Sequence, residues 1–473
     1  MTSVQEEVGL ASNTEIREGE YGEKVAAVEP GGAEFIPLSE RHGKPLNLFW
    51  TWMSPNFEFA TVYVGVLAVV AFGLDFKQAV ASIVLGTVLG SVTHGVLSAR
   101  GPQYGVPQMI LSRISFGYWG NALPAGINAV IAGVGWFAVN SVSGALALNT
   151  LIHLNKYGCL VIIVAAQIAI ALFGHNLVHL FERVAFPLLV VSFVLGAIWT
   201  FDKSHLGAAA PYAGGIGGFL ISTGATFGYA CGWNPYASDY TRYFAPDTSR
   251  SATGWWAGFG VALSCIALEI VGAASATVAT GKNLSPTAAF TSPYPTTVRD
   301  LVLLSIAVGA VAANAINIYS GAISFTALGF KIPLHLRRAL IAGVFGVAGF
   351  IVAAFGLNDI DKYENFLLII AYWIGPWLAV VFVDQLINRA AHADKLFDHK
   401  YANWAGPIAM AVGMGVSIPL FSNQLKFVGW VPKHHPKFGD LTFEVGFVVA
   451  AIVYFVLYNT ALGPKKAAAA ADA

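Results

Sequence analysis

The chain has 473 residues, of which 56% are hydrophobic and only 11% are charged. Soluble domains carry about 25% charged residues, so this composition excludes a water-soluble enzyme and a disordered chain. The 26 basic side chains balance 26 acidic ones, so no net field would attract a nucleic acid. The composition instead predicts a polytopic helical membrane protein whose surroundings are the lipid bilayer.

Both ends of the chain differ from its apolar middle. Residues 1–45 contain nine glutamates against four lysines and arginines, with no basic stretch leading into an apolar one. They predict a disordered cytoplasmic tail and no secretory signal. Residues 459–473 are alanine-rich and of low complexity, which predicts a second disordered tail.

Between these tails, apolar stretches alternate with short polar loops. A membrane-spanning helix needs roughly 20 residues, whereas the strands of a membrane barrel would alternate in polarity, which these stretches do not. The pattern therefore predicts an all-α protein with twelve transmembrane helices, at residues 48–72, 78–97, 123–151, 158–173, 184–200, 217–240, 255–280, 302–330, 340–355, 366–387, 406–421 and 443–457.

The basic residues are distributed unevenly between the two sides of this arrangement. With the N-terminus inside, the inner segments hold 17 of the 26 lysines and arginines and the outer loops hold 9. Cytoplasmic loops carry the excess of basic residues, and an even number of spans returns the chain to its starting side. The sequence thus predicts a multi-pass protein of the cytoplasmic membrane with both termini in the cytoplasm.

Two of the spans contain helix-breaking residues. Pro55, within Ser-Pro-Asn, interrupts the first span, and Pro235 with the nearby Gly232 interrupts the sixth. Such breaks at corresponding positions of two inverted repeats mark the binding sites of transporters. A pair of ordinary proline kinks is the alternative. Breaks five spans apart predict two five-helix repeats and two extra helices, at 46–200, 214–388 and 404–458.

Tryptophan and amide side chains lie at membrane depth. Trp136 lies near the centre of the third span, whereas membrane tryptophans usually lie at the interfaces, and Asn140 is on the same helix face. Trp233 follows Gly232, whose missing side chain would leave the backbone approachable. An indole stacks on a flat heteroaromatic ring and an amide reads its polar edge, so these residues predict a ring-binding site. Helix packing with an interhelical amide bond is the alternative.

The eighth span adds two amides, and two carboxyls lie inside spans. Asn314 and Asn317 are roughly on one face, where they can pair with an amidine edge or join helices. The packing role fits Asn314 better than Asn317. Glu58 follows the first break and Glu269 lies in the middle of the seventh span; each is either a proton carrier or a buried structural carboxyl. The three cysteines lie far apart and predict no metal site.

Five segments together resemble the nucleobase–cation symporter-1 family, in its purine–cytosine permease branch. They are FWTWMSPN in the first span, GPQYGVPQMILSRISFG before the third, GVGWFAVN in the third, GWNPYASDYTRYF in the sixth and NIYSG in the eighth. The resemblance implies a leucine-transporter-type fold of two inverted five-helix repeats plus two peripheral helices. It also implies a ring site formed by Trp136, Asn140, Gly232, Trp233, Asn317 and, beside the first break, Ser54.

The chain departs from these relatives in the eighth span. Branch members often have proline before the asparagine, where this chain has Ile316, and sodium-coupled relatives carry paired hydroxyls where it has Val311 and Ala312. A hard cation wants several oxygen ligands, so this departure favours a proton over sodium as the coupling ion, although backbone carbonyls could serve sodium. No other cofactor is implied.

The sequence therefore predicts a secondary active transporter, not an enzyme. It would import cytosine or purines such as adenine, guanine or hypoxanthine by proton symport with alternating access. A sodium-coupled carrier of the same fold for uracil, allantoin or hydantoins is the alternative, and an amino-acid carrier and a passive channel are two more. The sequence contains no P-loop, metal motif or nucleophile–base pair that would indicate catalysis.

Overall fold

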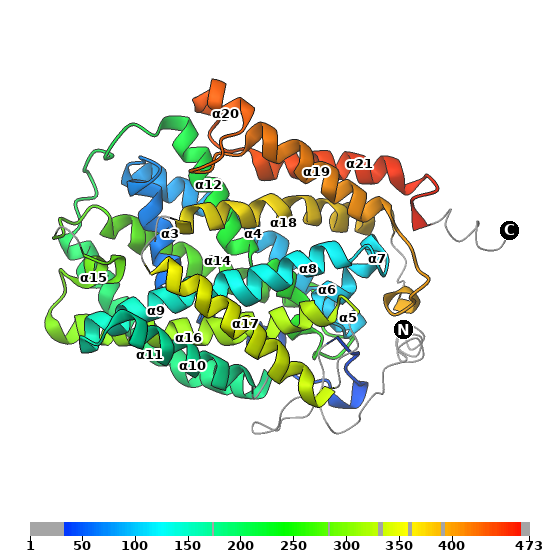
Figure 1. Ribbon diagram of the computed structural model, residues 1–473, viewed down its shortest axis with the longest axis horizontal. Coiled ribbons are helices and arrows are strands. Elements are labelled where there is room, and N and C mark those ends of the chain that lie inside the picture. Colours follow the sequence, from blue (N-terminus) through cyan, green and yellow to red (C-terminus); the bar gives the residue numbers. More distant parts are fainter. Residues whose placement is uncertain are drawn as a thin grey trace.

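The computed structural model describes residues 33–172, 175–281, 284–329, 334–357, 362–388 and 393–464. These residues form helices and connecting loops, and no strand longer than an isolated bridge occurs among them. The long helices run roughly parallel to one another, with α15 (Pro286–Thr291) at one end of the bundle and α5 (Gly101–Tyr104) and α7 (Arg113–Phe116) at the other (Figure 1).

Each of the twelve predicted spans falls on a helix of the structure. The helices that carry them are, in chain order, α2 (Pro45–Met53) with α3 (Phe59–Val70), α4 (Phe76–Ser98), α8 (Ala122–Val130) with α9 (Phe137–Ile152), α10 (Lys156–Leu172), α11 (His175–Lys203), α12 (Gly215–Cys231) with α13 (Ala237–Thr241), α14 (Arg250–Ser275), α16 (Thr296–Thr326), α17 (Leu334–Gly356), α18 (Lys362–Ile387), α19 (Ala405–Phe421) and α21 (Thr442–Tyr458).

Length and hydropathy agree with a multi-pass membrane protein. In the described ranges, six helices are long and apolar enough to cross a membrane, or seven when the bent pair of α2 and α3 counts as one span. Four shorter apolar helices accompany them. Short elements outside the spans include η1 (Leu38–Glu40), α6 (Gln108–Leu111), η5 (Ala393–Leu396), α20 (Trp430–His434) and η6 (Pro436–Phe438).

The helices form two groups that are related by a shift of five spans. One group contains α2 with α3, α4, α12 with α13, and α14; the other contains α8 with α9, α10, α16 and α17. The pairing of α4 with α12 matches that of α14 with α2 and α3, and the pairing of α10 with α16 matches that of α17 with α9. Each pair becomes the other when every helix is replaced by the one five spans away, which is the relation expected of inverted repeats.

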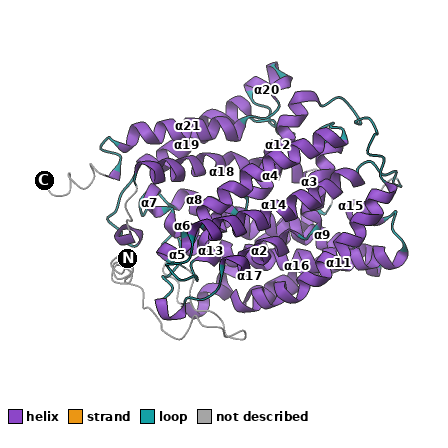
Figure 2. Cartoon of the chain, turned by 180° about the vertical axis from the view of Figure 1, so that it is seen from behind, coloured by secondary structure: helices purple, strands orange, loops and turns teal. Residues whose placement is uncertain are grey.

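The last two long helices lie outside both groups. Helices α19 and α21 pack against each other and along α18, on the outer side of the bundle (Figure 2). Helix α18 in turn packs against α12, and α11 packs against α16.

Both predicted helix breaks are present. Helix α2 ends at Met53, the 3-10 turn η2 (Ser54–Asn56) follows, and the chain bends by 65° before α3 continues. Helix α12 ends at Cys231, and the 3-10 turn η4 (Asn234–Tyr236) precedes α13. In both turns proline stands within the first two positions, where its missing N–H leaves no donor unsatisfied.

Two glycines allow α3 and α14 to approach until their backbones touch. A Cβ atom at Gly65 would lie 1.7 Å from the backbone oxygen of Glu269, and one at Gly272 would lie 1.8 Å from that of Val62. Any other residue would push the helices apart. This close packing fixes Glu269 beside the helix that follows the first break.

The predicted disordered tails are wrong where the structure describes them. Within 33–44, Ile36 is buried and its N–H donates to the carbonyl oxygen of Gly105 at 3.0 Å, and Arg41 donates to that of Pro102 at 2.6 Å. Leu462 likewise accepts a hydrogen bond from the N–H of Ala405 at 3.0 Å. These segments are ordered because they satisfy buried polar groups at the end of the bundle. Residues 1–32 and 465–473 lie outside the described residues.

Candidate substrate and coupling site

Trp136 is positioned by an irregular turn in the middle of the third span. Between α8 and α9 the chain forms the π-helical turn η3 (Ile131–Trp136), which ends at the tryptophan. Such turns insert a residue into a helix and often occur at functional sites. The indole is only 6% exposed, and it meets the rings of Tyr229 and Phe366 edge-on, with centroids 5.4 and 5.1 Å away. Trp136 thus faces α12 and α18 rather than lipid.

The structure brings Trp136 against the break in the sixth span. A Cβ atom at Gly232 would lie 3.3 Å from Cζ2 of Trp136, closer than an ordinary carbon–carbon contact. Gly232 has helical backbone angles (φ −53°, ψ −26°), so the backbone does not require glycine, whereas the close indole and the backbone oxygen of Tyr229 favour it. The contact joins the second helix group to the first.

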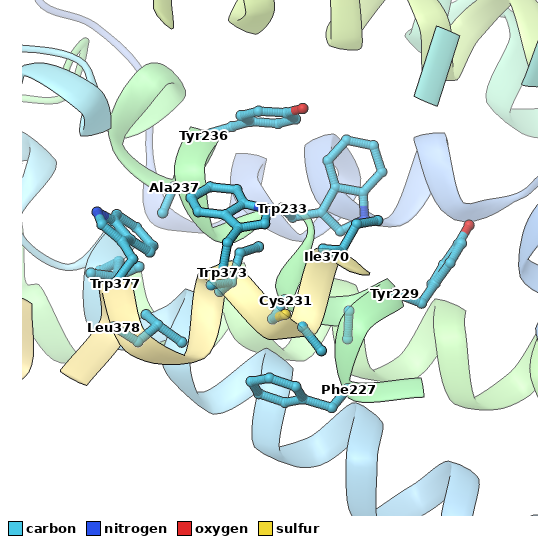
Figure 3. Packing of buried hydrophobic residues seen from close by; sticks show 14 of the residues in the cluster. Phe227, Tyr229, Cys231, Trp233, Tyr236, Ala237, Ile370, Trp373, Trp377 and Leu378 are labelled. Atoms are coloured by element: carbon cyan, nitrogen blue, oxygen red, sulfur yellow. The ribbon is translucent and has the colours of Figure 1, made fainter. Parts of the chain in front are cut away.

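Trp233, the next residue, connects the two breaks to each other. Its indole N–H donates to Oδ1 of Asn56 at 2.9 Å, and its ring packs against those of Trp52 and Tyr236. Figure 3 shows Trp233 and Tyr236 beside the part of α18 that carries Trp373. Because Asn56 lies in the break of the first span, this bond fixes one interrupted helix against the other.

The three predicted amides form a row in which Asn314 is central. Its Oδ1 accepts from Nδ2 of Asn140 at 3.0 Å and from Nδ2 of Asn317 at 3.3 Å, and its own Nδ2 donates to the carbonyl oxygen of Phe137 at 2.8 Å. Asn317 also accepts from the hydroxyl of Tyr236 at 3.5 Å. Asn314 therefore orients the two amides beside it, which agrees with the packing role considered for it.

Among the residues predicted to bind the ring, two buried polar atoms have no hydrogen-bond partner in the described part of the chain. They are Oδ1 of Asn140 and Oγ of Ser54, the first residue of the break in span 1. Both side chains are at most 3% exposed. A buried polar atom left without a partner costs about 1–3 kcal/mol, so unsatisfied atoms in this position fit a site that is completed by a ligand.

Glu58 lies immediately after the first break and faces α12. Its side chain is 2% exposed, and its Oε1 is 3.1 Å from the hydroxyl of Tyr229. That hydroxyl also contacts Oγ1 of Thr61, which donates to the backbone oxygen of Asn56 at 2.6 Å. Since the ring of Tyr229 packs against Trp136, the carboxyl is one side chain away from the indole.

Glu269 is fully buried on α14 and faces α4. Its Oε2 accepts from Oγ1 of Thr87 at 2.9 Å. Both carboxyls interact electrostatically with Tyr363 and Cys265, so they belong to one enclosed polar cluster. In the part of the chain that the structure describes, no three histidine, cysteine, aspartate or glutamate side chains come together as they would around a metal ion. Val311 and Ala312 are buried on α16 and present no side-chain oxygen.

An apolar cavity of about 350 Å³ adjoins the indole. It lies between α3, α9, α17 and α18 near α15, at the end of the bundle away from α5 and α7. Three of its lining residues touch or neighbour Trp136, namely Gly135, Tyr363 and Phe366. The cavity therefore lies against residues that contact the indole.

Sequence reasoning missed four residues that the structure adds to the site, namely Asn56, Thr61, Tyr229 and Tyr236. Tyr229 lies on α12, and Tyr236 is the last residue of the 3-10 turn η4. Both could be noticed in the sequence as aromatic residues next to the break, but the direction of the chain through the turn could not. The partners of Asn56 and Thr61 depend on the bend between α2 and α3, which hydropathy does not encode.

Comparison with known families matches residues 35–446 to the family described as permease for cytosine/purines, uracil, thiamine, allantoin. Among curated proteins, the chain is 29% identical over 451 residues to YxlA of Bacillus subtilis, covering 92% of this chain and 97% of that protein. It is 27% identical over 458 residues to the purine-cytosine permease fcyB of Emericella nidulans, covering 91% and 88%.

Solved structures share the fold. Mhp1, a nucleobase-cation-symport-1 family transporter, was solved in a closed conformation with bromovinylhydantoin bound; it matches 94% of this chain and 99% of its own with a TM-score of 0.68 at 18% identity. Its inward-facing conformation matches with a TM-score of 0.70 at 17% identity, covering 94% and 98%. The likeness confirms the predicted architecture of inverted repeats with broken helices.

Proposed function

Because the chain belongs to the family of permeases for cytosine and purines, uracil, thiamine and allantoin, we propose that it imports cytosine or a purine across the cytoplasmic membrane. It is a membrane transporter and not an enzyme. Within that class, the choice of a flat, polar heterocycle is supported by the pairing of a buried indole with buried amides.

The observation that carries this proposal is the unsatisfied amide beside the indole. The ring of the nucleobase stacks on Trp136, and the Oδ1 atom of Asn140 accepts a hydrogen bond from its amino or ring N–H group. Asn317 and Ser54 contact the rest of the polar edge. The missing side chain of Gly232 lets the indole approach the break in the sixth span closely, and Trp233 closes the site from the same span.

Transport follows from the origin of these residues in both helix groups. Ser54, Gly232 and Trp233 belong to the group of the broken helices, whereas Trp136, Asn140 and Asn317 belong to the other group. Rocking of one group against the other opens the site first toward the cavity and then toward the opposite end. The repeats would comprise residues 46–200 and 214–388, with 404–458 as the peripheral pair.

The coupling ion in this proposal is a proton. Val311 and Ala312 offer no side-chain oxygen for a sodium ion, whereas Glu58 and Glu269 are buried carboxyls close to the break. The excess of basic residues on one side supports termini in the cytoplasm. The cavity then opens to the outside, and the proton and the base enter together.

Uptake by purified protein in proteoliposomes tests the proposal. Radiolabelled cytosine, adenine and hypoxanthine should accumulate in wild-type vesicles under an inward proton gradient, and an uncoupler should abolish the accumulation. Trp136→Ala and Asn317→Ala should each reduce uptake by more than about tenfold, the effect of losing 1.4 kcal/mol or more. Trp255→Ala and Asn149→Ala remove the same side-chain types at an exposed and a half-buried position outside the proposed site, and should leave uptake unchanged.

Two results would contradict the proposal. Unaltered transport by both site variants would place the substrate elsewhere. Accumulation of uracil or allantoin under a sodium gradient, without competition by cytosine or purines, would favour the sodium-coupled alternative of the same fold.

A further inference from the structure

Four oxygen atoms form a chain between the carboxyl of Glu58 and the first helix break. Oε1 of Glu58 lies 3.1 Å from the hydroxyl of Tyr229, this hydroxyl contacts Oγ1 of Thr61, and Oγ1 lies 2.6 Å from the backbone oxygen of Asn56. All four residues are buried, at 2% exposure or less, and come from α12, from the break and from the segment that follows it. The chain therefore contains three hydrogen bonds in a row.

The number of protons in this chain is fixed by its chemistry. Each hydroxyl supplies one proton, and the backbone oxygen of Asn56 can only accept. Thr61 donates to Asn56, so Tyr229 must donate to Thr61, and the third proton has to come from Glu58. If the carboxyl were ionised, one of the three close oxygen pairs would have no proton between its atoms, which is repulsive.

The number of protons in the hydrogen bonds of Glu269 does not require its carboxyl to be protonated. It accepts from Thr87, whose single proton serves an ionised carboxyl as well as a neutral one. The two carboxyls are thus chemically distinct, although they lie in the same cluster and share Tyr363 and Cys265 as titratable neighbours.

The ring of Tyr229 connects this chain to the site beside the indole. Its hydroxyl lies between Glu58 and Thr61, and its ring meets the indole of Trp136 edge-on at 5.4 Å. A change in the hydrogen bonds of the hydroxyl therefore moves a ring that packs against the surface on which the base stacks.

We propose that Glu58 carries the coupling proton and that Tyr229 is a positioning residue through which the protonation of Glu58 controls binding at Trp136. This inference rests on the proposed function and names the coupling residue of the same site. With the proton on Glu58, all three hydrogen bonds form and the indole is held in place. When the site opens to the cytoplasm, the proton leaves Glu58 for water, and Tyr229 turns its own proton to the carboxylate. Tyr229 then no longer donates to Thr61, and the support of the indole is weakened as the base is released.

Infrared difference spectroscopy of the purified protein at pH 7 tests the proton count without any substrate. The wild type should show the carbonyl stretch of a buried protonated carboxyl that disappears in Glu58→Gln. In Tyr229→Phe this band should shift to higher frequency, because the carboxyl loses the acceptor for its proton. Glu269→Gln should retain the component that depends on Glu58. If Glu58→Gln removes no protonated-carboxyl band, the inference is overturned while the proposed function stands.

Transport measurements test the coupling. Gln can donate to Tyr229 as the protonated acid does, so Glu58→Gln should still exchange cytosine across the vesicle membrane, within about tenfold of wild type. It should not accumulate cytosine under a proton gradient. Tyr229→Phe cannot donate to Thr61, so it should bind cytosine more weakly than wild type. It should also lose most of the pH dependence of uptake, an effect that a merely structural role would not produce.

Tyr294→Phe is the matched control. It removes a buried tyrosine hydroxyl that pairs with Thr200 at 2.6 Å and takes no part in the oxygen chain, so it should keep the wild-type pH profile. Proton-driven accumulation of cytosine by Glu58→Gln, or an unchanged pH profile in Tyr229→Phe, would refute the inference. If no variant and no wild-type vesicle takes up cytosine, adenine or hypoxanthine, the proposed function fails instead, and the infrared result still decides the proton count.

Discussion

Replacing Gly232 by alanine is a small change that tests the position of the ring site. The backbone there is ordinary right-handed helix, so alanine imposes no backbone strain. The added methyl group would lie 3.3 Å from Cζ2 of Trp136 and 3.1 Å from the backbone oxygen of Tyr229. An ordinary contact needs 3.5–4.0 Å, so the indole has to move by about 0.2–0.7 Å.

The expected energetic effect follows from this geometry. Overpacking of this kind costs about 1–3 kcal/mol, and the change from glycine to alanine in a helix returns up to about 1 kcal/mol. We therefore expect the free energy of unfolding to fall by no more than about 3 kcal/mol. The methyl group also occupies space beside the indole face, and a loss of about 1.4 kcal/mol in binding would weaken the affinity for cytosine tenfold.

Binding of radiolabelled cytosine and thermal unfolding in detergent measure the two effects separately. Gly224→Ala is the matched control: Gly224 lies inside α12, the helix that Gly232 caps, and its methyl group would meet its nearest neighbour, Leu368, at an ordinary 3.5 Å. We expect it to bind cytosine normally. Gly232→Val should abolish binding. Wild-type affinity in both Gly232 variants would refute the placement of the ring beside this glycine.

Three further substitutions follow from the hydrogen bonds. Asn314→Ala leaves the amide donors of Asn140 and Asn317 buried without their acceptor. It should lower the free energy of unfolding by about 2–4 kcal/mol and weaken cytosine binding. Unchanged thermal unfolding would contradict this prediction. Tyr236→Phe removes the hydroxyl that donates to Asn317. It should reduce the affinity for cytosine by up to about tenfold with little effect on thermal unfolding. Equal affinities in the variant and the wild type would show that this bond does not contribute to binding. Asp440 lies outside the spans, and burial raises the pKa of its carboxyl. The folded protein therefore holds the carboxyl proton more tightly than the unfolded chain does, and it loses stability as pH rises from about 4 through the raised pKa. Asp440→Asn should remove that part of the pH dependence of thermal unfolding, and an unaltered slope would refute it.

The spans and the breaks could be predicted because each has a local cause. Apolar length produces a membrane helix wherever it occurs, and Pro55 and Pro235 interrupt helices by removing a backbone donor. The amide row was also accessible in part, since Asn314 and Asn317 share a helix face. The central position of Asn314 in this row could not be predicted, because it depends on hydrogen bonds to Phe137 and Asn140 of another span.

Other features depend on how distant segments meet. Residues 33–44 are ordered because Ile36 and Arg41 contact the segment near Gly105. The acidic composition of the N-terminal region gives no indication of these contacts. The π-helical turn before Trp136 has no motif of its own in the sequence. The oxygen chain from Glu58 through Tyr229 requires the 65° bend between α2 and α3, which sets Thr61 and Glu58 around one hydroxyl of α12.

A cryo-electron microscopy map of the transporter with cytosine or adenine bound tests the central claim most directly. The account predicts density for a flat ring on the indole face of Trp136, beside Gly232, with its polar edge toward Asn140 and Asn317. Density confined to the apolar cavity lined by Val142 and Phe355, with the indole and the amides uncontacted, would contradict it.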